Sequence, residues 1–294
     1  MMDPIPLYKV IIAFGILLVT SVSDWRSRMA QDRNWVLLGT LGIAFLGAQM
    51  LVDGVSSIYY LFLIPVAVFF YDIFWDREEE GIHIVPIVLY VTSFAIIGYL
   101  LWELRDAAYL WSLMIIPMMF LVIIVLYSLD LIKGGADAKA LIALSIMFPT
   151  YPIIDGFPLI AVPSELAEAF FPFPLVILFN AALLVMVLPL AFMVRNLIKG
   201  EARIPLMFFG YRMDVSEARE RFVWPLEVVN DGALKVVLFP KSGEDEWEKR
   251  QYDKLDEIGV TRVWVTPKVP FLIPMTMSLL FSALIGNLVF LIVG

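Results

Sequence analysis

Two aspartates, Asp24 and Asp137, lie where apolar segments of the chain meet short polar ones. Asp24 follows the first apolar segment and opens the string DWRSR, whereas Asp137 lies in the string KGGADAK at residues 133–139. Ionisable side chains at the edge of an apolar segment are costly, so each aspartate is a candidate for function. If the carboxyl groups met around one water molecule, one could take a proton from the water while the other polarised a peptide carbonyl. The pair is therefore a candidate catalytic dyad for peptide hydrolysis.

The two aspartates are expected at opposite kinds of helix end, which predicts different protonation states for their carboxyl groups. Asp24 would lie at a helix C-terminus, where the partial negative charge disfavours ionisation, and Asp137 at a helix N-terminus, where the partial positive charge favours it. Lys133 and Lys139 flank Asp137 and would favour its carboxylate further. We therefore expect Asp137 to be the resting carboxylate and Asp24 to be protonated more often. Taken singly, each aspartate also fits a structural role, as a helix cap or a polar residue at the membrane interface.

The loop before Asp137 consists of Gly134, Gly135 and Ala136. Its glycines let the backbone leave one helix and enter the next. Asp130 precedes this loop and fits either a substrate contact or, as we favour, the polar end of the preceding apolar segment. Four charged residues are candidates for substrate binding or for tuning the pKa values of the dyad: Lys133, Lys139, Asp130 and Arg26.

The composition is that of an integral membrane protein. Of the 294 residues, 61% are hydrophobic and 17% are charged, compared with about 45–50% and about 25% in soluble domains. No basic stripe accompanies the net charge of −8, so nucleic acid is not an expected partner. The chain has no cysteine and one histidine, which excludes disulfides, thiolate zinc sites and a cysteine nucleophile. We expect neither a metal nor a cofactor.

A helix needs about 20 mainly apolar residues to cross a bilayer. If eight such segments alternate in direction, most basic residues of the short loops fall on one side, which predicts that this side is cytoplasmic. Asp24 and Asp137 both fall on it. The eight expected spans are Tyr8–Ser23, Trp35–Val52, Ile58–Phe74, Ile82–Trp102, Leu110–Ile132, Ala138–Ile154, Phe173–Val194 and Pro270–Val293.

A charged stretch before the last span predicts a small cytoplasmic α/β domain. Leu226–Val229 and Ala233–Phe239 have the pattern of a β-hairpin, Ser242 precedes a charged helix that ends at Glu257, and Val260–Val265 alternates as a third strand. The predicted fold is an α-helical polytopic membrane protein of about eight transmembrane helices with this domain inserted. Its expected parts are a transmembrane domain with the dyad (1–198), the soluble insert (199–268) and a final transmembrane helix (269–294).

At the two aspartates the chain resembles the type IV prepilin peptidases and archaeal preflagellin peptidases, which are intramembrane aspartyl proteases of the GxGD type. That family pairs an aspartate at the cytoplasmic end of its first helix with a second aspartate in a Gly-x-Gly-Asp motif that opens a later helix. The string DWRSR at 24–28 matches the first element, and GGADAKAL at 134–141 matches the second, with Ala136 in place of a glycine. The resemblance covers about Tyr8–Asn34 and Leu110–Leu144.

The resemblance implies a membrane aspartyl endopeptidase in the cytoplasmic membrane, with its active site facing the cytoplasm. It implies that the partners are prepilin or archaellin precursors, from which a short basic leader is removed, and the lipid bilayer. Bacterial members that also methylate the new N-terminus carry a cysteine-pair zinc domain. Because this chain has no cysteine, cleavage without methylation is expected.

Two alternatives accompany this interpretation. Asp72 and Asp76 flank Trp75 and form either a solvated loop or an acidic surface where a basic leader docks. The chain also fits a proton- or ion-coupled transporter, with Gly134 and Gly135 breaking a helix. Carriers of that kind usually contain internal repeats, and no second copy of either aspartate motif is found in this sequence. The residues that would line an ion path are Asp24, Asp72, Asp130 and Asp137.

Overall fold

The computed structural model describes residues 3–75, 84–132, 134–160, 170–230, 232–238 and 245–288, together with residues 168 and 290. The chain divides into two compact units, one of residues 1–182 with 270–294 and one of residues 183–269. Both candidate aspartates belong to the first unit. The domain boundaries expected at 198 and 268 stay a prediction.

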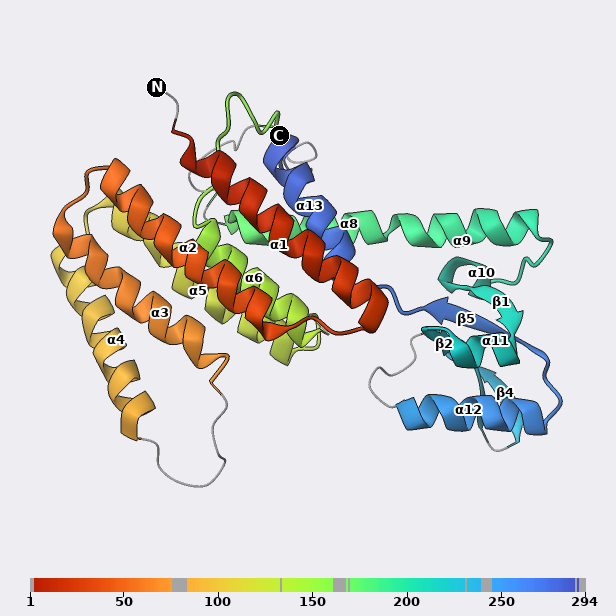
Figure 1. Ribbon diagram of the computed structural model, residues 1–294. Helices are drawn as coiled ribbons and strands as arrows, with labels where there is room; N and C mark the ends of the chain where they lie inside the picture. Colours follow the sequence, from red (N-terminus) through yellow and green to blue (C-terminus); the bar gives the residue numbers. More distant parts are fainter. Residues whose placement is uncertain are drawn as a thin grey trace. The chain divides into compact units, whose positions relative to one another are not determined.

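The described part of the first unit is built almost entirely of helices. Figure 1 shows α2 running beside α6, α1 beside α13, and α3 beside α4, and these pairs are in contact. In chain order the helices are α1 (Ile5–Ser27), α2 (Asp32–Val52), the 3-10 helix η1 (Ser57–Phe62), α3 (Leu63–Asp72), α4 (Ile84–Glu103), α5 (Ala108–Ser128), α6 (Gly135–Met147), α8 (Phe173–Val185) and α13 (Leu272–Leu284).

Five helical stretches in the described residues are long and apolar enough to cross a membrane. They are α1, α2, α4, α5 and residues Phe173–Ile198. The described residues are therefore mostly helical, as expected, and they contain five candidate membrane spans and not the eight that the sequence predicts. The other three expected segments contain shorter helices: η1 with α3, α6 and α13.

A proline and a glycine mark where two of these shorter helices stop. The expected helix at Ala138–Ile154 ends at Met147, because Phe148 precedes Pro149 and a residue before proline is pushed out of the helical region. At 13 residues, α6 is about 20 Å long, less than the roughly 30 Å hydrocarbon core. The helix α13 ends at Leu284, and Gly286 then has a φ of 107°, which favours glycine.

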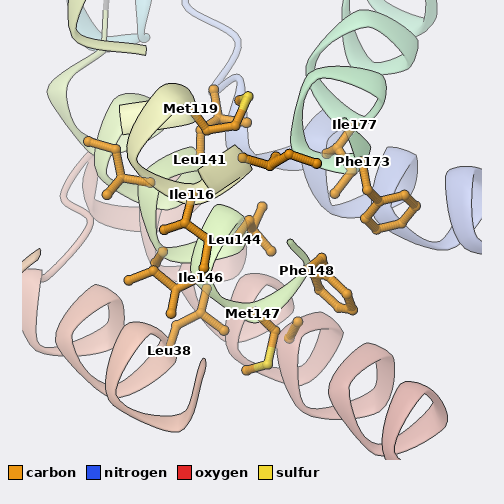
Figure 2. Close-up of a cluster of buried hydrophobic side chains, with 14 of the residues drawn as sticks. Leu38, Ile116, Met119, Leu141, Leu144, Ile146, Met147, Phe148, Phe173 and Ile177 are labelled. Carbon is orange, nitrogen blue, oxygen red and sulfur yellow. The ribbon is translucent and has the colours of Figure 1, made fainter. Parts of the chain in front are cut away.

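The helix α6 forms the centre of the first unit's core. Every residue from Ala140 to Met147 is buried. Figure 2 shows side chains from α2 (Leu38), α5 (Ile116, Met119) and α8 (Phe173, Ile177) around those of α6. Burial of apolar surface on all sides fixes this helix, although it is too short to cross a bilayer alone.

Glycines of α2 allow the neighbouring elements to approach closely. A Cβ at Gly42 would lie 3.0 Å from the backbone nitrogen of Met147, and one at Gly39 would overlap the Phe70 ring. Because the Gly42 contact is with backbone, no side-chain rotation could relieve it. The position of α6, and of the Asp137 that it carries, therefore depends on a small residue in α2.

The second unit contains the small α/β region that the sequence predicts. Its hairpin pairs β3 (Glu227–Asn230) with β4 (Ala233–Val236), and Asn230 lies opposite Ala233. A second, antiparallel sheet has the order β1-β5-β2 and includes two strands that were not expected, β1 (Tyr211–Asp214) and β2 (Val223–Pro225). The expected third strand is β5, which runs from Arg262 to Pro267. The helices of this unit are α9 (Val187–Ile198), α10 (Leu206–Phe209), α11 (Val215–Glu220) and α12 (Asp245–Glu257), and the expected helix start at Ser242 lies outside the described residues.

Candidate active site

Asp24 lies in the last turn of α1, which is fixed by hydrogen bonds to two other helices. Its carbonyl oxygen accepts the N–H of Arg28 (2.9 Å), and Arg28 ends the helix in a left-handed conformation with a φ of 55°. One turn earlier, the Thr20 hydroxyl accepts a hydrogen bond from the Asn34 amide of α2 (3.1 Å). Ser21 donates to a backbone carbonyl of α13 (2.9 Å). The end of α1 that carries Asp24 is thus attached to both α2 and α13.

Asp137 is the third residue of α6, and Gly134 is the N-cap of that helix. A Cβ at Gly134 would lie 2.9 Å from Asp137 Cγ and closer still to Oδ2, whereas carbon atoms pack at about 3.5–4.0 Å. The Asp137 carboxyl therefore folds back over Gly134, into space that exists because this residue has no side chain.

The other two residues of the motif loop are the first residues of α6. A Cβ at Gly135 would lie 3.7 Å from Tyr127 Oη, an ordinary contact distance. Ala136 is partly buried against the core and has helical backbone. The alanine in place of a glycine therefore needs no unusual backbone conformation at this position.

The two candidate aspartates are close enough to interact electrostatically. The charge of Asp24 acts on Asp137, and α1 is in contact with α6. Asp137 lies outside the five helices that are long enough to cross the membrane. Burial, and after it the Asp24 charge, raise the pKa of Asp137 to about 7. The expectation that Asp137 is the resting carboxylate is therefore wrong, because burial outweighs a helix-end effect of only about 0.3–1 kcal/mol.

Lys139 forms an ion pair that positions the start of α6. Its Nζ lies 2.7 and 2.8 Å from the two carboxylate oxygens of Asp32, the first residue of α2, and 5.2 Å from the centre of the Phe74 ring. This pair joins residues 107 positions apart. No spacing in the sequence indicates it, and Asp32 was not among the expected site residues.

The remaining expected site residues lie further out or outside the described residues. Arg26 is exposed and lines an apolar groove of about 500 Å³ between α1 and α13. Asp130 is exposed with a φ of 56°, and it follows α5, which ends at Ser128 and not at Ile132 as expected. Lys133 falls outside the residues that the structure describes.

Comparison with known proteins finds a family model that matches part of the chain and relatives that share one name. Residues 202–288 match the family model described as Archaeal Peptidase A24 C-terminus Type II. A protein of Methanococcus maripaludis named preflagellin peptidase is 26% identical over 279 residues, 92% of each chain. Proteins of the same name are 32% identical over 162 residues in Methanocaldococcus jannaschii and 29% over 161 residues in Methanococcus voltae. Those two alignments cover 52% of this chain and 63% and 64% of the relatives, less than two thirds of their length.

The chain is thus similar to archaeal A24 peptidases in residues 202–288 and to proteins named preflagellin peptidase over most of its length.

The matched family model and these three relatives all carry the name of a peptidase. This favours peptide hydrolysis over the ion-coupled transport that paired aspartates also fit. The matched family model covers most of the second unit and α13, whereas Asp24 and Asp137 lie outside residues 202–288. The part that each aspartate plays must therefore be argued from its surroundings in the first unit.

Proposed function

We propose that this chain is a membrane aspartic endopeptidase of the A24 type in which Asp24 and Asp137 form the catalytic dyad. The observation that carries the proposal is the electrostatic contact between two carboxyl groups from helices far apart in the sequence. Two neighbouring carboxyl groups cannot both ionise cheaply, so they hold one proton between them. The raised pKa of Asp137 makes it the group that keeps this proton, and Asp24 is then the carboxylate.

This assignment leads to a balanced sequence of proton transfers. Asp24 removes a proton from a bound water as its oxygen attacks the carbonyl carbon of the scissile bond, and Asp137 donates its proton to the carbonyl oxygen. When the tetrahedral intermediate collapses, the C–N bond breaks and Asp24 gives its proton to the leaving nitrogen. Asp137 recovers its proton from the hydroxyl that becomes the carbonyl of the new carboxyl group. Both aspartates return to their starting states.

The substrates that we propose are prepilin-like or preflagellin (archaellin) precursors, from which a short basic leader is removed. Support comes from the relatives named preflagellin peptidase and from the resemblance at the two aspartate motifs. Cleavage proceeds without N-methylation, because the chain lacks the cysteines of the bifunctional members.

We further propose that the chain crosses the cytoplasmic membrane eight times, with the dyad on the cytoplasmic side. The orientation rests on the basic residues of the short loops. The shorter helices α3, α6 and α13 would complete the crossing together with the residues that flank them. Asp24 ends α1 and Asp137 begins α6, so that both carboxyl groups fall on the same side in this topology.

A cleavage assay tests the proposal. Membranes that contain the full chain are incubated with an epitope-tagged preflagellin, and the shortened product is measured. Asp24→Asn and Asp137→Asn should each abolish cleavage, while Asp130→Asn, a change in an exposed acid near the same loop, should leave it within about twofold of the wild-type rate. Full cleavage by either dyad variant, at an equal level of folded protein, would remove the catalytic assignment.

A further inference from the structure

A polar pocket of the first unit lies away from the candidate dyad. Its volume is about 320 Å³, within the range of about 300–1,000 Å³ that is usual for small-molecule sites. It lies where α1 begins, α2 ends and α5 begins, and residues that follow α6 complete its wall. Asp24 is in the last turn of α1 and Asp137 in the first turn of α6, so the dyad is at the other ends of these two helices. The pocket is also separate from the acidic surface expected at Asp72 and Asp76, because Asp72 accepts a hydrogen bond from Tyr90 of α4 and Asp76 lies outside the described residues.

A buried lysine lines this pocket. Lys9, in the second turn of α1, is only 7% exposed. Within the part of the chain that the structure describes, its ammonium group has no hydrogen bond and no ion pair. Lysine side chains near a helix end usually extend so that the ammonium stays in water, and a buried charge without a direct partner is costly. The Lys9 ammonium is therefore available to a ligand that carries acceptor oxygens.

Two carboxylates at the exposed side of the pocket are oriented by neutral donors. Gln49 Nε2 donates to Asp3 Oδ2 at 3.1 Å and to Asp53 Oδ1 at 2.9 Å, and the Tyr109 hydroxyl donates to Asp53 Oδ2 at 3.1 Å. Amide and phenol groups fix the carboxylates without neutralising their charge, and a carboxylate oxygen can accept a further hydrogen bond. Both acids are exposed, and their charges act on Lys9. The pocket thus has an ammonium group inside and two carboxylates at its opening.

This distribution of charge favours a zwitterion. An anion alone would be attracted by Lys9 and repelled by Asp3 and Asp53, and a simple cation would be repelled by Lys9. A ligand with acceptor oxygens towards Lys9 and an ammonium group towards the carboxylates makes charge-assisted hydrogen bonds at both ends. The ligand must therefore carry its negative and positive groups a short distance apart.

The location of the pocket indicates the source of such a ligand. The helices α1, α2 and α5 are candidate membrane spans, and the ends of spans lie at the membrane–water interface. Phospholipid headgroups are concentrated there, and the ethanolamine headgroup joins a phosphate to an ammonium group.

We propose that this pocket binds a zwitterion of the phosphoethanolamine type, supplied by a lipid headgroup. Lys9 binds the phosphate, and Asp3 and Asp53 bind the ammonium group. Binding at this site does not depend on peptidase activity, and it adds a lipid site at the ends of α1 and α6 that are remote from the dyad.

The test titrates the purified full chain, in detergent, with three phospholipids that share their acyl chains and differ in headgroup. Apparent dissociation constants come from the midpoint of thermal unfolding, because a ligand that binds the folded state raises it. The ethanolamine lipid should bind at least about tenfold more tightly than the choline lipid, whose amine has no N–H, and than the glycerol lipid, which has no amine. Soluble phosphoethanolamine is a further arm. Protection by both compounds would assign binding to the headgroup alone, protection by the lipid alone would show that the acyl chains contribute, and both results support the site.

Two substitutions should have opposite effects on the glycerol lipid. Lys9→Met removes the ammonium group and should weaken binding of the ethanolamine and glycerol lipids by about tenfold. Asp53→Asn removes a carboxylate that repels anions, so it should weaken binding of the ethanolamine lipid and strengthen binding of the glycerol lipid. The matched control is Lys254→Met, the same change at an exposed lysine of α12, which should alter neither affinity.

Equal binding of the three lipids, binding of none, or an ethanolamine preference that persists in Lys9→Met would refute the site. If Lys9→Met lost its cooperative unfolding transition, Asp53→Asn would decide. An unchanged headgroup preference in that variant would refute the site as well.

Discussion

Replacing Gly134 by alanine should separate activity from stability, because its one added methyl group meets the Asp137 carboxyl directly. The Cβ would lie 2.9 Å from Asp137 Cγ, about 1 Å inside the usual carbon contact distance. The carboxyl must move by about that amount. Since a 1 Å displacement of a reacting group lowers rates by up to about 100-fold, we expect Gly134→Ala to reduce kcat/KM for preflagellin by about 10- to 100-fold.

The stability cost should be small. Gly134 has a φ of −95° and a ψ of 120°, a conformation that alanine adopts readily. The clash is with the end of a flexible side chain, and moving it off its rotamer costs about 0.5–1.5 kcal/mol. Thermal unfolding in detergent should therefore show a shift of only a few degrees.

Gly135→Ala is the matched control. Its Cβ would lie 3.7 Å from Tyr127 Oη, without a clash, and alanine in a helix is about 0.5–1 kcal/mol more favourable than glycine. This variant should keep its activity within about twofold. Equal activity of the two variants, or a loss by Gly135→Ala alone, would refute the placement of the Asp137 carboxyl over Gly134.

Three further predictions follow from the same geometry. Because Asp137 must hold a proton and burial raises its pKa to about 7, kcat/KM should fall as the pH rises above about 7; a rate that keeps increasing with pH contradicts this. Gly42→Ala places a Cβ 3.0 Å from the α6 backbone and should lower the free energy of unfolding by about 1–3 kcal/mol. Gly47→Ala, whose added Cβ would have its nearest contact at 3.5 Å, should leave the free energy of unfolding unchanged. Equal losses of stability in the two variants on thermal unfolding would contradict the close packing of α2 on α6. Asp32→Asn removes the partner of Lys139, and because the ion pair is partly exposed, the free energy of unfolding should fall by no more than about 1 kcal/mol. The dependence of kcat/KM on pH should stay unchanged, and a shifted pH profile would show that Lys139 tunes the dyad.

The sequence predicts the helical membrane class and the α/β region because both depend on local patterns. Long apolar runs identify α1, α2, α4 and α5, and Asn230 before a glycine turn identifies the hairpin. Helix lengths were less accurate. The run Ala138–Ile154 is apolar throughout, but Pro149 ends its helix early, and apolar composition alone does not distinguish a buried short helix from a span.

In the candidate site, too, features that depend on neighbouring residues in the sequence could be predicted, and features that depend on tertiary packing could not. The glycine loop and Asp137 share one short motif and could be found together in the sequence. The protonation state of Asp137 could not be predicted from the sequence. The helix-end effect is visible in the sequence, whereas the larger effect of burial requires the packed structure. The pair of Asp32 with Lys139 and the contact of Asp72 with Tyr90 depend on tertiary structure as well.

The central claim, that Asp24 and Asp137 meet and influence each other's protonation, can be measured without any substrate. Infrared titration of the carboxyl stretch in the purified full chain, with Asp137→Asn to assign the band, gives the pKa of Asp137 directly. Removing the Asp24 charge by Asp24→Asn should bring this pKa down from about 7 towards its ordinary value of 3.8, while Asp130→Asn should leave it in place. An Asp137 pKa that is the same with and without the Asp24 charge would contradict the dyad.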